Sequence, residues 1–265
     1  ENLMSRYALV TGASSGIGLA LAEALARRGR NLILVARKRD ALESIAYELT
    51  QRFSVDVLFR VCDLSEPLQL SGLLHELEQN GQVIELLVNN AGLGSGGAFV
   101  AQDWRREQQL LEVNVLALAR LCHAIGTVMA ARGHGQILNI ASVAAFQPGP
   151  WMSSYYASKA YVLHFSEGLR EELRAHGVKV SVLCPGPTHS AFFRNAQLDT
   201  SALERGKLML SAEEVALIAV RGLERNRAII VPGWRNRLLT MAPRLFPRWL
   251  VRRIAARINR RFGRA

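Results

Sequence analysis

The sequence predicts one α/β domain, in which helices cover both faces of a doubly wound parallel sheet of about seven strands. Short apolar runs alternate strictly with longer amphipathic stretches along the chain, and this alternation is typical of a parallel sheet. The runs NLILVA and IELLVN are continuously apolar, as expected of strands that are buried on both faces. No internal repeat or Pro/Gly/Ser-rich linker divides the 265 residues, so a single domain is expected.

The expected elements follow in chain order. The strands are short runs rich in leucine or β-branched residues, namely Tyr7–Val10, Leu32–Ala36, Val55–Val61, Glu85–Asn89, Gln136–Ile140, Lys179–Leu183 and Ala228–Val231. The helices are longer stretches with a helical period of apolar residues, namely Ile17–Arg28, Asp40–Arg52, Pro67–Asn80, Trp104–Arg132, Ser154–His176 and Ala212–Asn226. Gly29 and Gly177 follow two of these helices, where a left-handed C-terminal residue is favourable.

Composition argues against several classes of protein. A hydrophobic fraction of 49% with 21% charged residues is ordinary for a soluble globular protein. Cys62, Cys122 and Cys184 are far apart and form no C-x-x-C, which indicates buried thiols of a reduced, cytoplasmic protein. The six histidines include no H-E-x-x-H, so no metal site is expected. No apolar run approaches the ~18 residues of a membrane span.

The positive charge is concentrated at the C-terminal end. The net charge is +11, from 33 basic and 22 acidic residues, and residues 235–265 hold ten arginines and no acid. Without these ten the chain carries only +1, so a nucleic-acid-binding face on the main body is not supported. We expect a catalytic domain over residues 4–232 and a basic amphipathic extension over residues 233–265.

The stretch YALVTGASSGIG, residues 7–18, permits two interpretations. Its G-A-S-S-G segment fits G-x-S-x-G, the serine elbow of hydrolases, but that elbow normally follows several strands and precedes a histidine. Here the segment follows the first strand, and no histidine occurs after His189. A glycine-rich turn between the first strand and a helix is instead typical of dinucleotide-binding proteins, where the helix N-terminus receives the pyrophosphate.

The three glycines suit this second interpretation. Gly12 permits the turn, Gly16 lets the backbone approach the phosphates, and Gly18 lets the helix pack close to the sheet. The spacing G-x-x-x-G-x-G differs from the G-x-G-x-x-G of many dehydrogenases, and a simple turn is the alternative.

The end of the second expected strand indicates which dinucleotide is bound. An acidic residue here would bind the ribose 2′-hydroxyl of NAD, but the sequence has Arg37-Lys38-Arg39. No carboxylate repels a 2′-phosphate, and guanidinium is a good bidentate partner for one. NADP (NADPH) is therefore favoured over NAD, with a solvated basic helix start as the alternative.

From Arg6 to Pro232 the chain resembles the short-chain dehydrogenase/reductase family, which implies a Rossmann-type fold. Thr11–Gly18 matches its T-G-x-x-x-G-x-G motif, and Asn89-Asn90-Ala91-Gly92 matches its N-N-A-G. The family's order and rough spacing of catalytic residues are matched by Asn114, Ser142 and Tyr155-x-x-x-Lys159. Its segment beside the nicotinamide is matched by Pro185-Gly186 and Thr188.

The resemblance implies a catalytic set and a cofactor site. The catalytic residues are Asn114, Ser142, Tyr155 and Lys159. The cofactor-binding residues are Gly12, Ser14, Ser15, Gly16, Ile17, Gly18, Arg37, Asp63, Leu64, Asn90, Ala91, Gly92, Tyr155, Lys159, Pro185, Gly186 and Thr188, with Asp63 beside the adenine. A homo-oligomer is also expected, because family members often pair through the two long helices that correspond to Trp104–Arg132 and Ser154–His176.

Reduction of a ketone needs a hydride from the nicotinamide and a proton for the developing alkoxide. A free phenol has a pKa of about 10, which is poor for exchange near neutrality. Lys159 lies one helical turn after Tyr155, and its positive charge is expected to lower the phenol pKa. Tyr156 also faces Lys159, at i,i+3; the family spacing selects Tyr155 as proton donor and leaves Tyr156 to packing.

Ser142 and Asn114 each have a functional and a structural interpretation. Ser142 ends a strand at the carboxyl edge of the sheet, where its hydroxyl can donate to the substrate oxygen or can simply cap a turn. Asn114 is awkward inside a helix, because asparagine competes for backbone hydrogen bonds. The resemblance implies that it supports a water linking Lys159 to solvent; otherwise it indicates helix strain or a buried polar contact.

The expected substrate is a small-molecule carbonyl compound or alcohol. Aromatic and apolar residues flank the catalytic segments, which suggests an apolar pocket for a lipophilic ketone such as an acyl chain or steroid-like ring; they are Phe146, Trp151, Met152, Phe192 and Phe193. Filling of the core or of an interface is an equal alternative for these residues. A non-catalytic nucleotide-binding regulator on the same fold is the second function considered, although a regulator need not keep the whole catalytic set.

The tail RWLVRRIAARINRRF, residues 248–262, forms a basic amphipathic pattern. It places Leu250, Val251, Ile254, Ile258 and Phe262 near one helical face, with arginines over the rest. Such a helix can lie on an anionic membrane, or it can pack on the body or on a second subunit. The expected location is cytoplasmic, and peripheral membrane contact through this helix is left open.

Overall fold

The strands form one parallel sheet in the order β3-β2-β1-β4-β5-β6-β7. The computed structural model describes residues 6–189 and 209–262, and the side chains up to residue 260. The strands are β1 (Arg6–Thr11), β2 (Asn31–Ala36), β3 (Val57–Val61), β4 (Val83–Asn89), β5 (Gly135–Ile140), β6 (Val178–Leu183) and β7 (Ile229–Ile230). Every neighbouring pair is parallel, so the predicted sheet is confirmed.

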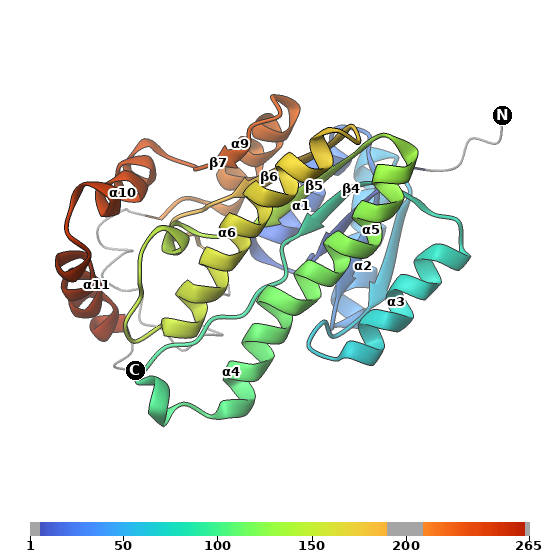
Figure 1. Cartoon of the computed structure of the whole chain (residues 1–265). Coiled ribbons are helices and arrows are strands. Elements are labelled where there is room, and N and C mark those ends of the chain that lie inside the picture. The colour runs from blue at the N-terminus through green and yellow to red at the C-terminus, as the bar shows by residue number, and fades with distance from the viewer. Residues whose placement is uncertain (1–5, 190–208, 263–265) are drawn as a thin grey trace.

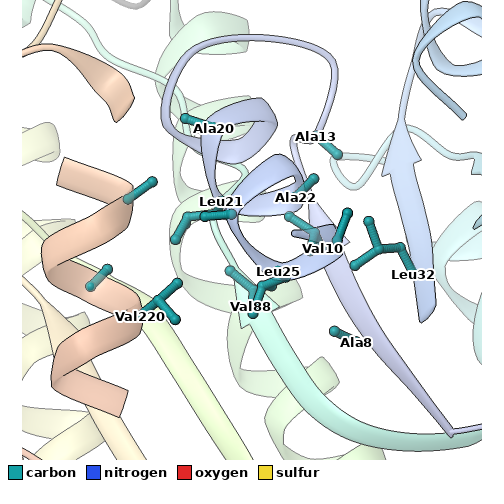
Figure 2. Close-up of a cluster of buried hydrophobic side chains, with 14 of the residues drawn as sticks. Ala8, Val10, Ala13, Ala20, Leu21, Ala22, Leu25, Leu32, Val88 and Val220 are labelled. Atoms are coloured by element: carbon teal, nitrogen blue, oxygen red, sulfur yellow. The ribbon is translucent and has the colours of Figure 1, made fainter. Parts of the chain in front are cut away.

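Helices cover both faces of this sheet (Figure 1). They are α1 (Gly16–Ala26), α2 (Arg39–Phe53), α3 (Pro67–Gln79), α4 (Trp104–Leu111), α5 (Leu118–Arg132), α6 (Ser153–Arg174), α9 (Ala212–Glu224), α10 (Trp234–Leu245) and α11 (Arg248–Phe262). One buried cluster joins α1, α2 and α9 to the sheet, and a second joins α3, α5 and α6 to it. Figure 2 shows the first cluster, in which Leu21 and Leu25 of α1 lie close to Val88 of β4 and Val220 of α9.

The order of the strands places a switch point between β1 and β4. The chain runs outward from β1 through β2 to β3 and then returns to begin the other half of the sheet at β4, beside β1. In open sheets of this kind, ligands bind outside the carboxyl ends of the strands at the switch point. A ligand-binding site is therefore expected at the segments that follow β1 and β4.

The long helix Trp104–Arg132 is present, but its middle is wider than an α-helix. The π-helical segment Glu112–Ala117 joins α4 to α5 and contains Asn114. This helix of 29 residues is also long and apolar enough to cross a membrane, which corrects the expectation that no stretch approaches that length. Half of its most apolar window is buried, and α5 packs on β4 and β5 as a core helix does.

Strand β7 has two residues, whereas the sequence predicts four, Ala228–Val231. It pairs on one side only, with Val182 and Leu183 of β6. Pro232 follows shortly afterwards and has no backbone N–H to continue a ladder. The three cysteines are buried and free, as the sequence predicts.

Two helices, α10 and α11, follow the sheet and lie at one end of the molecule (Figure 1). The apolar residues on the expected face of α11 differ in their exposure to solvent. Val251 is buried together with Ala255 and Asn259, whereas Ile254 and Ile258 are about half exposed. The packed side of α11 is therefore displaced from the apolar side that the sequence suggests.

Candidate active site

The glycine-rich loop joins β1 to α1 at the switch point. Gly12 and Gly16 have positive φ angles of 65° and 56°, which glycine adopts without strain. A Cβ atom on Gly18 would lie 2.3 Å from the Gly12 carbonyl oxygen, so α1 approaches the loop too closely for any side chain. Ser15 is the N-cap of α1 and makes no side-chain cap. The N–H groups of the first turn can therefore serve an anion such as a phosphate.

Thr11 and Asn90 fasten this loop to the end of β4. The Thr11 hydroxyl accepts hydrogen bonds from the backbone N–H groups of Asn90 and Ala91, both at 3.0 Å. The Asn90 side-chain amide donates in return to the Thr11 and Gly12 carbonyl oxygens, at 3.0 and 3.2 Å. The role of Thr11 could not be predicted from the sequence, because its partners lie about 80 residues further along the chain. These bonds hold the glycine-rich loop against the segment after β4, at the expected cofactor site.

Arg37 and Asp63 follow the neighbouring strands β2 and β3. Their charged groups lie 3.8 Å apart, and the Arg37 side chain is 63% exposed. One Asp63 carboxylate oxygen accepts bonds from the Ser65 N–H and hydroxyl groups, while the adjacent Leu64 is buried. The Arg39 guanidinium instead lies over the Phe59 ring. Arg37 therefore lies near Asp63, the residue that is expected beside the adenine.

Ser142 and Tyr155 meet at the carboxyl ends of β5 and β6. Ser142 follows β5 and caps the 3-10 helix Val143–Phe146, accepting a bond from the Ala144 N–H at 3.1 Å. A hydrogen bond also joins its hydroxyl to that of Tyr155. The structure confirms that Ser142 caps a turn, and its donation to a substrate oxygen stays a prediction.

Lys159 lies beneath this pair and is buried. Its ammonium donates to the Ile140 carbonyl oxygen at 3.0 Å and lies 5.9 Å from the centre of the Tyr155 ring. Burial lowers the pKa of Lys159 to about 8. Burial also raises the pKa of Tyr155 to about 12, against a smaller lowering by the Ser142 bond. The expected lowering of the phenol pKa is therefore wrong for this structure, because burial disfavours the charged phenolate.

Asn114 clamps the segment after β4 to the long helices. Its side-chain amide pairs with both backbone groups of Leu93, at 2.8 and 2.9 Å, and donates to the Ser158 hydroxyl at 3.0 Å. Ser158 in turn donates to the Tyr155 carbonyl oxygen. A Cβ atom on Gly92 would lie 3.4 Å from Asn114 Oδ1 and 3.3 Å from Lys159 Nζ. The buried polar contact that the sequence left open for Asn114 is thus present.

The segment after β6 borders the same site. The Pro185 carbonyl oxygen accepts a bond from the Val143 N–H at 3.0 Å, while Gly186 packs against Asn236 of α10. Thr188 is buried and forms an isolated β-bridge with Leu210. Phe192 and Phe193 lie outside the described residues.

Tyr156 turns away from this group toward the C-terminal helix. Its hydroxyl donates to Asn259 Oδ1 at 3.2 Å, and Asn259 Nδ2 donates to the Pro150 carbonyl oxygen at 3.0 Å. The Tyr156 ring also lies against Gly149, where any side chain would collide with it. The structural role of Asn259 was not predicted from the sequence, because no local pattern distinguishes a single asparagine in an arginine-rich helix.

A glycine-rich turn and an uncapped helix start at the switch point, with a tyrosine, serine and lysine beside them, define a dinucleotide-dependent oxidoreductase. The sequence profile described as short chain dehydrogenase matches residues 6–201. The chain belongs to the short-chain dehydrogenase family and is an oxidoreductase that acts on CH–OH donors.

Relatives and solved structures agree with this assignment. Sulfoacetaldehyde reductase 2 of Chromohalobacter salexigens is 34% identical over 80% of this chain and 86% of its own. The short-chain dehydrogenase from Sphingobium yanoikuyae, solved in complex with NADPH, is 34% identical with a TM-score of 0.82, covering 90% and 94% of the two chains. The bulky-bulky ketone specific alcohol dehydrogenase from Comamonas testosteroni is 33% identical with a TM-score of 0.76, covering 90% and 92%.

Proposed function

We propose that this protein is an NADPH-dependent carbonyl reductase that also runs in reverse as an alcohol dehydrogenase. The observation that carries the proposal is the hydrogen bond between the Ser142 and Tyr155 hydroxyls at the carboxyl edge of the sheet, with Lys159 buried beneath them. A carbonyl oxygen that takes the place between these hydroxyls would receive two O–H donors. The residues assigned to cofactor binding surround the same edge.

The roles of the residues follow from their protonation states. Bound NADPH supplies the hydride. Tyr155 keeps its proton at neutral pH, because its pKa is about 12, and it donates this proton to the developing alkoxide. Ser142 donates a hydrogen bond to the same oxygen as charge develops there. Lys159 remains mostly protonated below its pKa of about 8 and holds the nicotinamide ribose, while Asn114 positions the segment that contains Gly92.

NADPH is proposed over NADH on the strength of Arg37. Its exposed guanidinium, 3.8 Å from Asp63, can move to a ribose 2′-phosphate, and no acid occupies the end of β2. The uncapped start of α1 and the close approach of Gly12 to Ala91 fit a bound pyrophosphate. The NADPH complex of the Sphingobium relative supports the same choice.

The substrate is proposed to be a lipophilic ketone. Met152 and Ala144 are buried next to Tyr155, and the Comamonas relative is named for bulky ketones. The name of the Chromohalobacter relative, by contrast, gives a small polar aldehyde. A substrate panel decides between these classes: faster NADPH oxidation with bulky apolar ketones than with small polar carbonyls supports the proposal, and the reverse order contradicts it.

Two further features of the whole protein belong to this proposal. Residues 4–232 form the catalytic domain and residues 233–265 an extension that packs on it through Asn236 and Asn259. The protein acts in the cytoplasm as a homo-oligomer, which exposed apolar residues on the two long helices support, among them Val128 and Tyr161. Light scattering of the purified protein tests the oligomer.

Two matched variants test the catalytic role of Tyr155. Tyr155→Phe is expected to lower the rate of hydride transfer roughly 100-fold or more, because the proton donor is removed. Tyr156→Phe, the same change one residue on, removes the hydroxyl that bonds to Asn259 and Gln147 and is expected to keep most activity. Nicotinamide absorbance reports both rates, and retained NADPH binding shows that each variant is folded. Inactivation by Tyr156→Phe alone would contradict the assignment, and dinucleotide binding without hydride transfer by the wild type would favour a regulator.

A further inference from the structure

Helix α10 has its apolar side in solvent and its polar side against the protein. Trp234, Leu238, Met241 and Leu245 recur at i, i+4, i+7 and i+11, so they share one side of the helix. Their exposed fractions are 68%, 58%, 58% and 77%. The buried residues of α10 are Asn236 and Thr240. This is the reverse of the pattern that packing of a helix on a globular core requires.

The orientation of α10 is held by the polar side chains on its inner face. Asn236 packs against Gly186, where a Cβ atom would lie 2.4 Å from its side-chain oxygen, and it donates to the Pro232 carbonyl oxygen at 2.7 Å. The Thr240 hydroxyl donates to the Arg237 carbonyl oxygen at 2.8 Å. Rotation of the helix to bury its apolar side would break the contact at Gly186, which also borders the active site.

Large apolar side chains are also exposed to solvent in α11 and in the segment that joins it to α10. With the four residues of α10 they form what we name the C-terminal apolar surface: Trp234, Leu238, Leu239, Met241, Leu245, Phe246, Trp249, Ile254 and Ile258. Each is between 49% and 77% exposed. Scattered single exposed apolar residues are normal on proteins, but so many within 25 residues indicate an interaction surface.

The positive charge around this surface favours an anionic partner. Eight exposed arginines accompany it, namely Arg235, Arg237, Arg244, Arg248, Arg252, Arg253, Arg257 and Arg260. Across the described parts of the chain none of them forms an ion pair with a carboxylate, and no acid follows Glu224 in the sequence. A second copy of the protein would bring the same positive charge against it, whereas an anionic lipid surface neutralises it.

The two exposed tryptophans have the environment of interfacial anchors. The Arg235 guanidinium lies 5.4 Å from the centre of the Trp234 ring, and Arg253 lies at the same distance from Trp249. Tryptophan and arginine favour the boundary between lipid headgroups and acyl chains, since each combines an apolar body with a polar or charged end. Leucine and isoleucine beside them supply the apolar area that is buried below that boundary.

We propose that the C-terminal apolar surface docks the protein on anionic membranes, with the outer side of α10 as its main insertion face. The sequence pattern pointed to residues 248–262, but α10 has more large apolar side chains exposed to solvent than α11 has. Docking holds the protein on one leaflet without crossing it. It also places α11, which contacts the active-site helix through Asn259 and Tyr156, at the lipid surface. The proposal stands whether or not the substrate is lipophilic.

The test measures binding of the full chain to vesicles by co-sedimentation. Wild-type protein is expected to bind vesicles of phosphatidylcholine with phosphatidylglycerol, to bind pure phosphatidylcholine vesicles much less, and to be released by high salt. The double variant Trp234→Gln, Leu238→Gln is expected to bind the anionic vesicles roughly tenfold more weakly, because the inserted apolar area is reduced. Tyr47→Gln, Leu68→Gln, a matched change at 71% and 87% exposed positions on the main body, is expected to bind as wild type does.

The outcomes separate docking from its alternatives. Equal loss in both double variants, or equal binding to neutral and anionic vesicles, would overturn the proposal. So would light scattering that shows a smaller assembly for the α10 variant than for the wild type without lipid, because the surface would then be an interface between copies. Thermal unfolding within a few degrees of wild type shows that each variant is folded.

Discussion

At the residue scale, Tyr155 and Lys159 show how burial decides protonation in the site. Burial raises the pKa of Tyr155 to about 12 and lowers that of Lys159 to about 8. Both groups therefore hold a proton at neutral pH, which is the state needed for proton donation from the phenol. The ammonium contributes by position and charge near Gly92 and Ile140 rather than by acidifying the phenol in this structure.

Lys159→Met is expected to stabilise the fold at neutral pH while it lowers activity. The unfolded chain keeps the Lys159 proton up to about pH 10.5, whereas the folded chain releases it near pH 8. Between these values the unfolded state binds more protons, so wild-type stability rises with pH, and the buried ammonium destabilises the fold below pH 8. With the lost bond to Ile140 included, the gain at pH 7 is roughly 1–2 kcal/mol.

Urea unfolding at pH 7 and pH 9.5 measures this effect, and the gain is expected to shrink at the higher pH. The exposed Lys179 provides the control, because Lys179→Met removes the same charge from a solvated position. A Lys159→Met protein that is less stable than the wild type at pH 7 would show that the ammonium stabilises the fold.

Arg37→Ser is expected to raise the KM for NADPH about tenfold or more and to leave the KM for NADH nearly unchanged. The guanidinium is the proposed partner of the 2′-phosphate, which only NADPH carries. Steady-state kinetics with both cofactors measure the change. Arg39→Ser is the control, since Arg39 lies over Phe59; an equal effect of the two changes would indicate general loss of positive charge.

At the element scale, the β1–α1 turn depends on the absence of side chains. Gly18 stands where α1 presses on the loop, with Asn90 Nδ2 and the Gly12 carbonyl oxygen both 2.3 Å from a Cβ position. The backbone at Gly12 cannot move away from such a Cβ without disturbing the hydrogen bonds between Thr11 and Asn90, which join the loop to the end of β4. Packing of one helix on one loop thus sets the shape of the cofactor site.

Gly18→Ala is accordingly expected to weaken NADPH binding at least tenfold and to destabilise the protein by about 1–3 kcal/mol. Gly72→Ala in α3 is the matched control, because a Cβ there meets nothing within 4 Å. That variant is expected to gain up to about 1 kcal/mol from helix propensity. Calorimetric titration and urea unfolding report both quantities, and equal behaviour of the two variants would refute the steric account.

At the scale of the whole molecule, α10 and α11 join the far end of the chain to the active site. Asn236 packs on Gly186, and Asn259 bridges Tyr156 to Pro150. Both asparagines are buried. The side-chain amide of Asn236 donates to the Pro232 carbonyl oxygen, and that of Asn259 donates to the Pro150 carbonyl oxygen. The C-terminal helices therefore contribute to the architecture around α6 as well as to the outer surface.

Asn259→Ala is expected to destabilise the protein by about 1–3 kcal/mol, because the Tyr156 hydroxyl and the Pro150 carbonyl oxygen each lose a partly buried hydrogen bond. Arg257→Ala, an exposed change in the same helix, is expected to alter stability by less than about 0.5 kcal/mol. Urea unfolding compares the two, and equal stabilities would mean that α11 is not fastened through Asn259.

Much of the fold and site could be predicted because the relevant signals are local. Continuous apolar runs located the strands, and glycine and tyrosine–lysine spacings located the expected cofactor and catalytic residues. The π segment at Asn114 could not be predicted, because no local pattern marks it, and its Asn114 pairs with Leu93, which lies 21 residues away. Ser158, Asn236 and Asn259 were missed for the same reason: their partners are distant in sequence, and no local pattern marks them.

The sequence by itself determined the order of strands and helices, the parallel sheet and the chemistry present at its carboxyl edge. Those properties follow from periodicity and from residue types at fixed short spacings. Only the tertiary structure decided the phenol pKa and which side of each C-terminal helix faces solvent. Both depend on how much water is excluded around a group, and that quantity is set by contacts between segments that are far apart in the chain.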